Sequence, residues 1–145
     1  MRFWDTSALL PTIVDEPTTD ACLSLLSMDP TVVVWEGTLI ELLSVVGRLR
    51  REAEGLDDLC SSIRLDVQSR WATWARVADW SRVSVPAQRL VSVHPLKAAD
   101  SLQLAAAIVA SEERPHALPF VTRDRALARA AQLEGFPVIV PASTD

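Results

Sequence analysis

The segment MRFWDTSAL, residues 1–9, determines how the rest of the chain is interpreted. It begins with apolar and aromatic residues, and a carboxylate, Asp5, is followed at once by the hydroxyls of Thr6 and Ser7. An extended segment over residues 2–6 that turns directly into a helix leaves Asp5 at the carboxyl end of a strand. Ligands of open α/β sheets bind at that edge. The opening segment therefore predicts an α/β fold with a functional carboxylate at its ligand edge.

Length and composition are typical of one globular domain. The chain has 145 residues, of which 49% are apolar, so we expect a single domain over residues 1–145 with a real core. No signal peptide is visible, and the longest apolar run, residues 104–110, is far shorter than a membrane span. We therefore expect a cytoplasmic protein with no membrane partner. Cys22 and Cys60 form no metal or redox motif and are expected to be reduced thiols, with a disulfide as the alternative.

The charge balance bears on nucleic-acid binding in two ways. A net charge of −5 argues against a protein that coats nucleic acid by bulk attraction. The basic residues are nonetheless thirteen Arg and one Lys, and Arg matches phosphate geometry, although a GC-rich genome would give the same bias. Clustered acids would lower the net charge without excluding a nucleic-acid substrate, because bound divalent cations reverse the local field.

Strand and helix signals alternate along the chain. Strands are predicted at residues 2–6, 31–35, 120–122 and 138–140, and the clearest helix, residues 38–53, stops at Gly55. Other helices are predicted near Ala8 with Ser7 as cap and a break at Pro11, and over 17–27, 56–68, 70–80, 97–112 and 125–134. Residues 83–93 fit either a short helix opened by Pro86 or a fragment of strand. The alternation predicts a mostly parallel sheet with helices on both faces.

Four acids are candidates for a shared site, and each also has an ordinary explanation. Asp5 could cap the first helix, although Thr6 or Ser7 could cap it equally well. Glu41 falls on the helix face opposite the apolar residues, which is ordinarily exposed to solvent, although small residues beside it would leave room for a cleft. Asp100 complements a helix dipole, but its helix is otherwise apolar. Asp124 follows a strand and suits an N-cap, a role that Thr122 could also fill.

The joint pattern favours a metal-dependent site. Three of these acids fall at strand-to-helix junctions or helix starts on the expected ligand edge. Oxygen-only clusters bind hard cations such as Mg²⁺ or Mn²⁺, which neutralise the crowded carboxylates and activate water against a phosphodiester. The chain has no GxSxG, HExxH, P-loop or GxGxxG motif. His94 and His116 lie in proline-containing loops and are expected to be structural or solvent-facing.

Four segments carry a resemblance to a known family. They are FWDTSALL (3–10), IELLSVVGRLRR (40–51), HPLKAADSLQLAAAIVA (94–110) and PFVTRDRALARAAQLEGFPVIVP (119–141). On these segments the chain resembles a PIN domain, specifically a VapC-type toxin ribonuclease of a type II toxin–antitoxin pair. The acidic residues of that family correspond to Asp5, Glu41, Asp100 and Asp124, and Thr122 matches a threonine two residues before the last acid.

The resemblance implies a three-layer α/β/α fold, dependence on Mg²⁺ or Mn²⁺ and endonucleolytic cleavage of RNA. It also implies a homodimer and a VapB-like antitoxin that covers the active-site groove. The segment between residues 80 and 97 is shorter than in many relatives, so we expect a trimmed helix before Asp100. The alternatives are a housekeeping PIN nuclease in RNA maturation and a non-catalytic PIN-like interaction module.

As a hypothesis, Asp5 and Asp100 bind a first cation, and Glu41 and Asp124 complete the site or hold a second ion. Thr6, Ser7 and Thr122 would orient carboxylates or waters. Candidates for holding RNA phosphates are Arg48, Arg123 and Arg125. Trp71 and Trp74, at helical spacing, are expected to pack in the core or at a dimer interface rather than to stack on bases.

Overall fold

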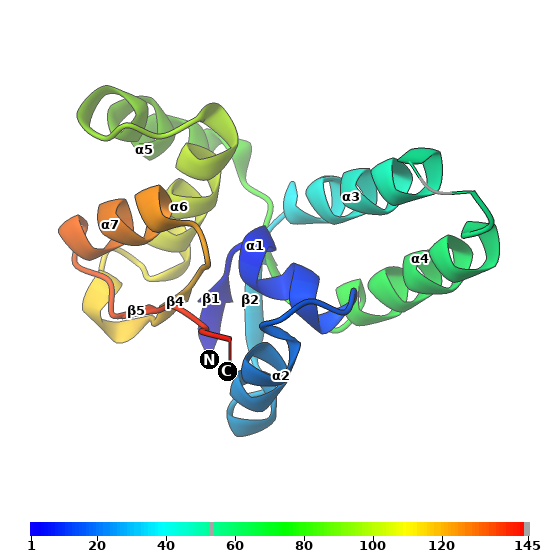
Figure 1. Ribbon diagram of the computed structural model, residues 1–145. Coiled ribbons are helices and arrows are strands. Elements are labelled where there is room, and N and C mark those ends of the chain that lie inside the picture. The colour runs from blue at the N-terminus through cyan, green and yellow to red at the C-terminus, as the bar shows by residue number, and fades with distance from the viewer. Residues whose placement is uncertain (53, 144–145) are drawn as a thin grey trace.

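The computed structural model describes residues 1–52 and 54–143, and within them five parallel strands form one sheet (Figure 1). The strands are β1 (Arg2–Trp4), β2 (Val32–Trp35), β3 (Ala75–Val77), β4 (Phe120–Val121) and β5 (Val138–Ile139). Their order across the sheet is β3-β2-β1-β4-β5. The predicted α/β class with a parallel sheet is confirmed.

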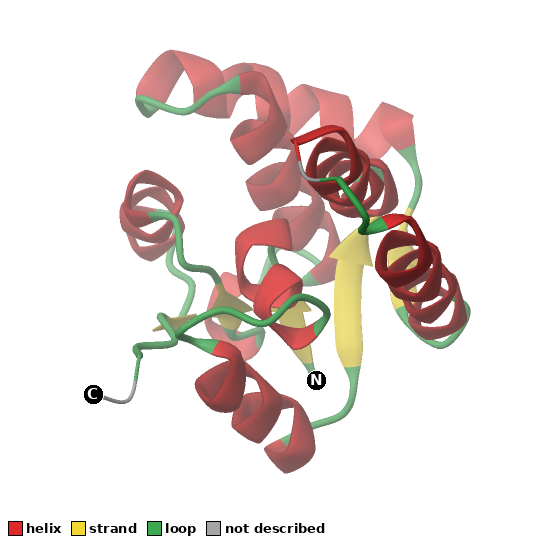
Figure 2. Ribbon diagram, turned by 45° about the vertical axis from the view of Figure 1, so that its right-hand side comes forward, coloured by secondary structure: helices red, strands yellow, loops and turns green. Residues whose placement is uncertain are grey.

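Helices cover both faces of the sheet. Successive side chains of each strand point to opposite sides, so buried apolar side chains lie on both faces. Phe3, Val33 and Phe120 pack on one face against α5 (Trp80–Val93), α6 (Ala98–Ala110) and α7 (Arg125–Leu133). Trp4 and Val34 pack on the other face against α1 (Thr6–Leu9), α2 (Thr19–Met28), α3 (Thr38–Glu52) and α4 (Asp57–Trp71). Two short 3-10 helices, Leu10–Thr12 and Pro115–Ala117, complete the elements of the described residues. Figure 2 shows the sheet between the two helical layers, which confirms the three-layer α/β/α arrangement.

The predicted helix over residues 70–80 is wrong. Helix α4 runs unbroken to Trp71, and strand β3 follows it. This strand has only three residues and is held by parallel pairing with β2, in the register Val33 with Ala75 and Trp35 with Val77. That pairing is a tertiary interaction, so no local helix signal could reveal it.

The segment before Asp100 folds into a helix, α5. Helix α5 spans fourteen residues and contains Pro86, and Asp79 caps its start by accepting a hydrogen bond from the Arg82 N–H at 3.2 Å. Val83, Ala87 and Leu90 are buried at helical spacing, so packing on the sheet offsets the hydrogen bond that the proline cannot donate. The ambiguity over residues 83–93 is thereby resolved in favour of helix.

Smaller differences occur at the ends of elements. Helix α1 begins at Thr6, with Asp5 rather than Ser7 as its cap, so β1 ends at Trp4. Helix α2 begins two residues after Pro17. Residue 53, the predicted last residue of the third helix, lies outside the described residues. Within the described ranges no helix is both long and apolar enough to cross a bilayer.

Candidate active site

The site lies where the strand order changes direction, which is the topological switch point of the sheet. From β1 the chain adds β2 and β3 on one side of the sheet, and β4 and β5 are then added on the other side. The crevice outside the carboxyl ends of two such strands is the usual ligand site of an open parallel sheet. Asp5 directly follows β1, and residues 122–124 directly follow its neighbour β4.

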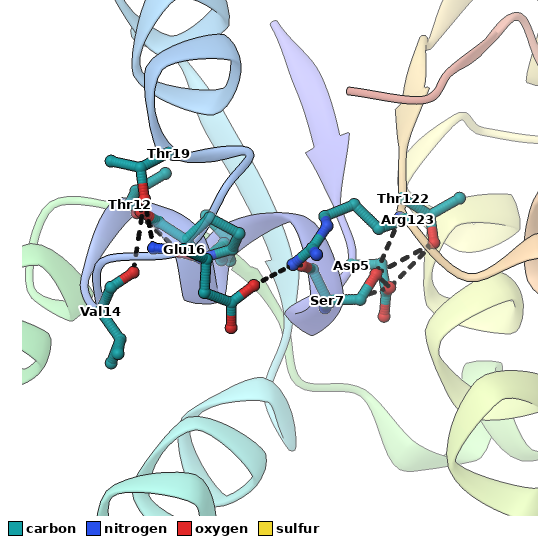
Figure 3. A network of polar contacts seen from close by, with 10 residues as sticks. Asp5, Ser7, Thr12, Val14, Glu16, Thr19, Thr122 and Arg123 are labelled. Carbon is teal, nitrogen blue, oxygen red and sulfur yellow. Dashed lines mark hydrogen bonds and ion pairs between the residues drawn. The ribbon is translucent and has the colours of Figure 1, made fainter. Parts of the chain in front are cut away.

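Asp5 is the most deeply buried of the four candidate acids, with 4% of its surface exposed. Its Oδ2 accepts hydrogen bonds from the Ser7 N–H at 3.2 Å, the Ser7 hydroxyl and the Thr122 hydroxyl at 2.9 Å (Figure 3). Among the described residues no group donates to its Oδ1. Burial raises the pKa of Asp5 to about 6, against the lowering effect of the Ser7 and Thr122 hydrogen bonds, and repulsion from Glu41 adds to the rise.

Each of the four candidate acids repels the next one electrostatically, and we call the four together the acidic row. Burial also raises the pKa of Glu41. Hydrogen bonds from Thr6 and Gln103 oppose this rise, and repulsion from Asp100 adds to it. The pKa of Asp100 is likewise raised, first by burial and then by repulsion from Asp124. The fold therefore brings Asp5, Glu41, Asp100 and Asp124 into one acidic region, although α3, α6 and two strand ends supply them.

These side chains do not form a closed metal cage. In the described part of the chain, no three His, Cys, Asp or Glu side chains form a group that could hold a metal ion. The chemistry of the donors nevertheless suits Mg²⁺ or Mn²⁺, because all are carboxylate oxygens and Asp5 has one oxygen without a protein donor. Mg²⁺ commonly keeps several waters and takes one or two carboxylates together with substrate phosphates. The site fits a hydrated ion held in this way.

Asp124 has a structural role as well as a place in the acidic row. Its Oδ1 caps α7 by accepting a hydrogen bond from the Leu127 N–H at 2.7 Å. Thr122, the alternative cap, is fully buried, and its hydroxyl donates to Asp5 and accepts from the Asp124 N–H at 3.1 Å. Thr122 thus connects the first and last acids of the row.

Gln103, which was not among the predicted site residues, is a buried polar link between the elements that carry these acids. It is 1% exposed on α6, and its side-chain amide reaches Thr6, Thr38 and Glu41. The signal in the sequence was a lone amide three residues after Asp100 on an otherwise apolar helix.

Arg123, a candidate phosphate ligand, is engaged within the protein. Its guanidinium forms an ion pair with Glu16 and lies 3.4 Å from the Ser7 carbonyl oxygen, and its backbone N–H donates to the Ser7 hydroxyl at 2.9 Å (Figure 3). Arg48 and Arg125 are exposed. Arg123 therefore connects the segment around Glu16 with Ser7, which hydrogen-bonds Asp5.

Fold and site together define an α/β protein with an acidic cluster at the switch point of a parallel sheet. The PIN domain family matches residues 2–133, and the chain belongs to that family. The resemblance found in the sequence is thereby confirmed. A comparison with curated proteins finds no match.

Several solved structures share the fold over nearly the whole chain. A toxin–antitoxin complex from Klebsiella pneumoniae has 16% identity and a TM-score of 0.69, covering 99% of this chain and 100% of that one. FitAcB from Neisseria gonorrhoeae has 20% identity and a TM-score of 0.68, covering 97% and 98%. VapBC2 from Rickettsia felis, bound to a DNA fragment from its promoter, has 13% identity and a TM-score of 0.60, covering 96% and 97%. At these identities the likeness concerns the fold.

Proposed function

We propose that the protein is a divalent-cation-dependent endoribonuclease that acts as the toxin of a toxin–antitoxin pair. The observation that carries this proposal is the buried carboxylate of Asp5 at the switch point, in a row with three further acids. A buried charge without a cationic partner is costly to the fold. A buried acid whose pKa is raised, as that of Asp5 is, is typical of a functional site in such a position.

In this proposal Asp5 and Asp100 hold a first Mg²⁺ or Mn²⁺, and Glu41 and Asp124 complete the site or hold a second ion. Such an ion, when bound, supplies an activated water and stabilises the leaving oxygen of a phosphodiester. The protein's own contribution is orientation. Ser7 and Thr122 fix Oδ2 of Asp5, which leaves its Oδ1 available.

The proposed partners are RNA, a VapB-like antitoxin over the groove and a second copy of the chain. Support comes from the family and from the fold shared with the toxin–antitoxin complex from Klebsiella pneumoniae and with VapBC2. We propose that the chain works as one domain in the cytoplasm, where Arg48 and Arg125 help to hold RNA phosphates. A non-catalytic module is less well supported, because all four acids are present. A housekeeping nuclease is distinguished from a toxin by the absence of an antitoxin gene beside its own.

The direct test is incubation with total cellular RNA, with Mg²⁺ or Mn²⁺ and with chelator, followed by mapping of the new RNA ends. We expect cation-dependent cleavage at defined sites. Asp5→Asn and Asp100→Asn should abolish it. Glu113→Gln, the same kind of exchange at an exposed acid outside the site, is the matched control and should cleave normally. Undiminished cleavage by both site variants would contradict the assignment.

The toxin role is tested separately in growing cells. Expression of the wild-type chain should arrest growth, and expression of Asp5→Asn should not. Co-expression of the protein encoded by a small adjacent reading frame should relieve the arrest. RNA cleavage in vitro without any growth arrest would favour the housekeeping alternative.

A further inference from the structure

Gln103 is an amide in a place where the packing of α6 would otherwise be apolar. It is 1% exposed, and its helical neighbours Leu104, Ala106 and Ala107 are fully buried. Burying an amide without partners costs free energy, so such a side chain is kept only where hydrogen bonds compensate for it.

The partners of Gln103 come from two other elements. Its Nε2 donates toward Thr6 Oγ1 at 2.9 Å, Thr38 Oγ1 at 3.0 Å and Glu41 Oε1 at 3.2 Å. Its Oε1 lies 3.4 Å from the Thr38 hydroxyl. Thr6 directly follows Asp5 on α1, whereas Thr38 and Glu41 belong to α3. One side chain of α6 therefore holds together the parts of the chain that carry three of the four acids.

We propose that Gln103 is a positioning residue that fixes the Glu41 carboxylate, and with it the cation affinity of the acidic site. The proposal rests on the proposed function, because it concerns the same site. The geometric reason is that Glu41 is carried by a long, flexible side chain on α3. The Gln103 amide restrains this carboxylate by a hydrogen bond of 3.2 Å to its Oε1. Groups that orient metal-binding carboxylates commonly change metal affinity or activity by about 10- to 100-fold when they are removed.

A purely structural role is the competing explanation. In that case Gln103 only satisfies the buried hydroxyls of Thr6 and Thr38, and its loss would lower stability without changing the site. The two explanations differ in what happens to cation binding.

The test uses Gln103→Met, which keeps the length and approximate volume of the side chain and removes its hydrogen bonds. Mn²⁺ binding is measured by electron paramagnetic resonance on the full chain. We expect the Mn²⁺ dissociation constant to rise about 10-fold or more. Ser111→Ala is the matched control, because Ser111 is also buried, directly follows α6 and donates its hydroxyl to the Ile108 carbonyl oxygen rather than to the acidic row. The control should bind Mn²⁺ like the wild type.

RNA cleavage provides a second readout. For Gln103→Met we expect kcat to fall at limiting Mn²⁺ and to recover at saturating Mn²⁺, with KM for RNA unchanged. If this variant does not fold, Gln103→Asn, which keeps the amide but is too short to reach Glu41, replaces it with the same expectation.

Two outcomes overturn the proposal, and they are distinguishable. A variant that melts earlier but binds Mn²⁺ within about 2-fold of the wild type would show that Gln103 is structural, and would leave the nuclease proposal intact. Wild-type protein that neither binds Mn²⁺ nor cleaves RNA would remove the proposed function and this inference together.

Discussion

The burial of Asp5 should cost the cation-free protein stability at neutral pH. Burial raises the pKa of Asp5 in the folded protein to about 6. The contribution of this group to folding is therefore most favourable at a pH below the pKa that an aspartate has in the unfolded chain. That contribution is lost as the pH rises through about 6. We therefore expect Asp5→Asn, which keeps an oxygen for Ser7 and Thr122, to stabilise the protein at pH 7.5 by as much as about 3 kcal/mol. Urea unfolding in chelator measures this.

The dependence on pH and cations separates this effect from a general stabilisation. The gain from Asp5→Asn should shrink as the pH is lowered from 7.5 toward 4.5, because the wild-type carboxyl group then becomes protonated. Added Mn²⁺ should raise the stability of the wild type more than that of the variant. A variant less stable than the wild type at pH 7.5 would contradict the idea that burial of the Asp5 charge costs more than its hydrogen bonds return.

At the scale of elements, the positions of the strand-to-helix junctions were predictable to within two residues, although Ser7 was predicted as the first cap and Asp5 is the observed one. Both Asp5 and Asp124 follow a short apolar run and precede a helix, and both cap the helix that follows. A local pattern is sufficient to locate such a junction, because capping depends on residues only two or three positions apart, but it does not choose between neighbouring cap residues such as Asp5 and Ser7. The catalytic roles assigned to the same acids stay predictions.

Elements that depend on distant partners were less predictable. Strand β3 has an exposed pattern and exists through its pairing with β2, and α5 tolerates Pro86 because three of its residues are buried against the sheet. Gln103 was not among the predicted site residues. Its partners lie 62 to 97 residues away in the sequence, so its function as a link appears only in the folded chain.

The two roles of Asp124 can be separated by substitution. Asn is as good an N-cap as Asp, so Asp124→Asn should leave stability nearly unchanged while lowering RNA cleavage strongly. Asp124→Ala loses the hydrogen bond from Leu127 as well and should also cost about 1 kcal/mol of stability. Thermal unfolding and RNA cleavage are measured on both variants. Equal cleavage by Asp124→Asn and the wild type would restrict Asp124 to capping.

Another contact between two elements, which involves no member of the acidic row, joins α5 to the end of α7. Glu134 accepts hydrogen bonds from Arg89 at 3.0 Å and pairs with His94 at 2.7 Å, which gives His94 a structural role. The Arg89 hydrogen bond lowers the pKa of Glu134, with a smaller lowering by His94. The stabilisation is therefore present at neutral pH and lost as the pH falls through the lowered pKa of Glu134.

Glu134→Gln should accordingly destabilise the protein at pH 7 by about 1 kcal/mol, since Arg89 is half-exposed and its pair with Glu134 is screened. The difference from the wild type should disappear in acid. Mn²⁺ affinity and RNA cleavage should not change, because none of the three residues belongs to the acidic row. Chemical unfolding at several pH values measures the difference, and a constant loss at every pH would point to packing instead.

At the scale of the whole molecule, the proposed RNA binding should depend on cations, because the net charge is −5 and the acidic row repels phosphates. In chelator, repulsion should keep single-stranded RNA away from the site. Ca²⁺, which has the same preference for oxygen ligands, should tighten binding about 10-fold or more. Fluorescence anisotropy of a labelled RNA measures this. Tight binding in chelator with a steep dependence on KCl would instead place the RNA on exposed arginines, and Arg48→Ala should then reduce that salt slope by about one.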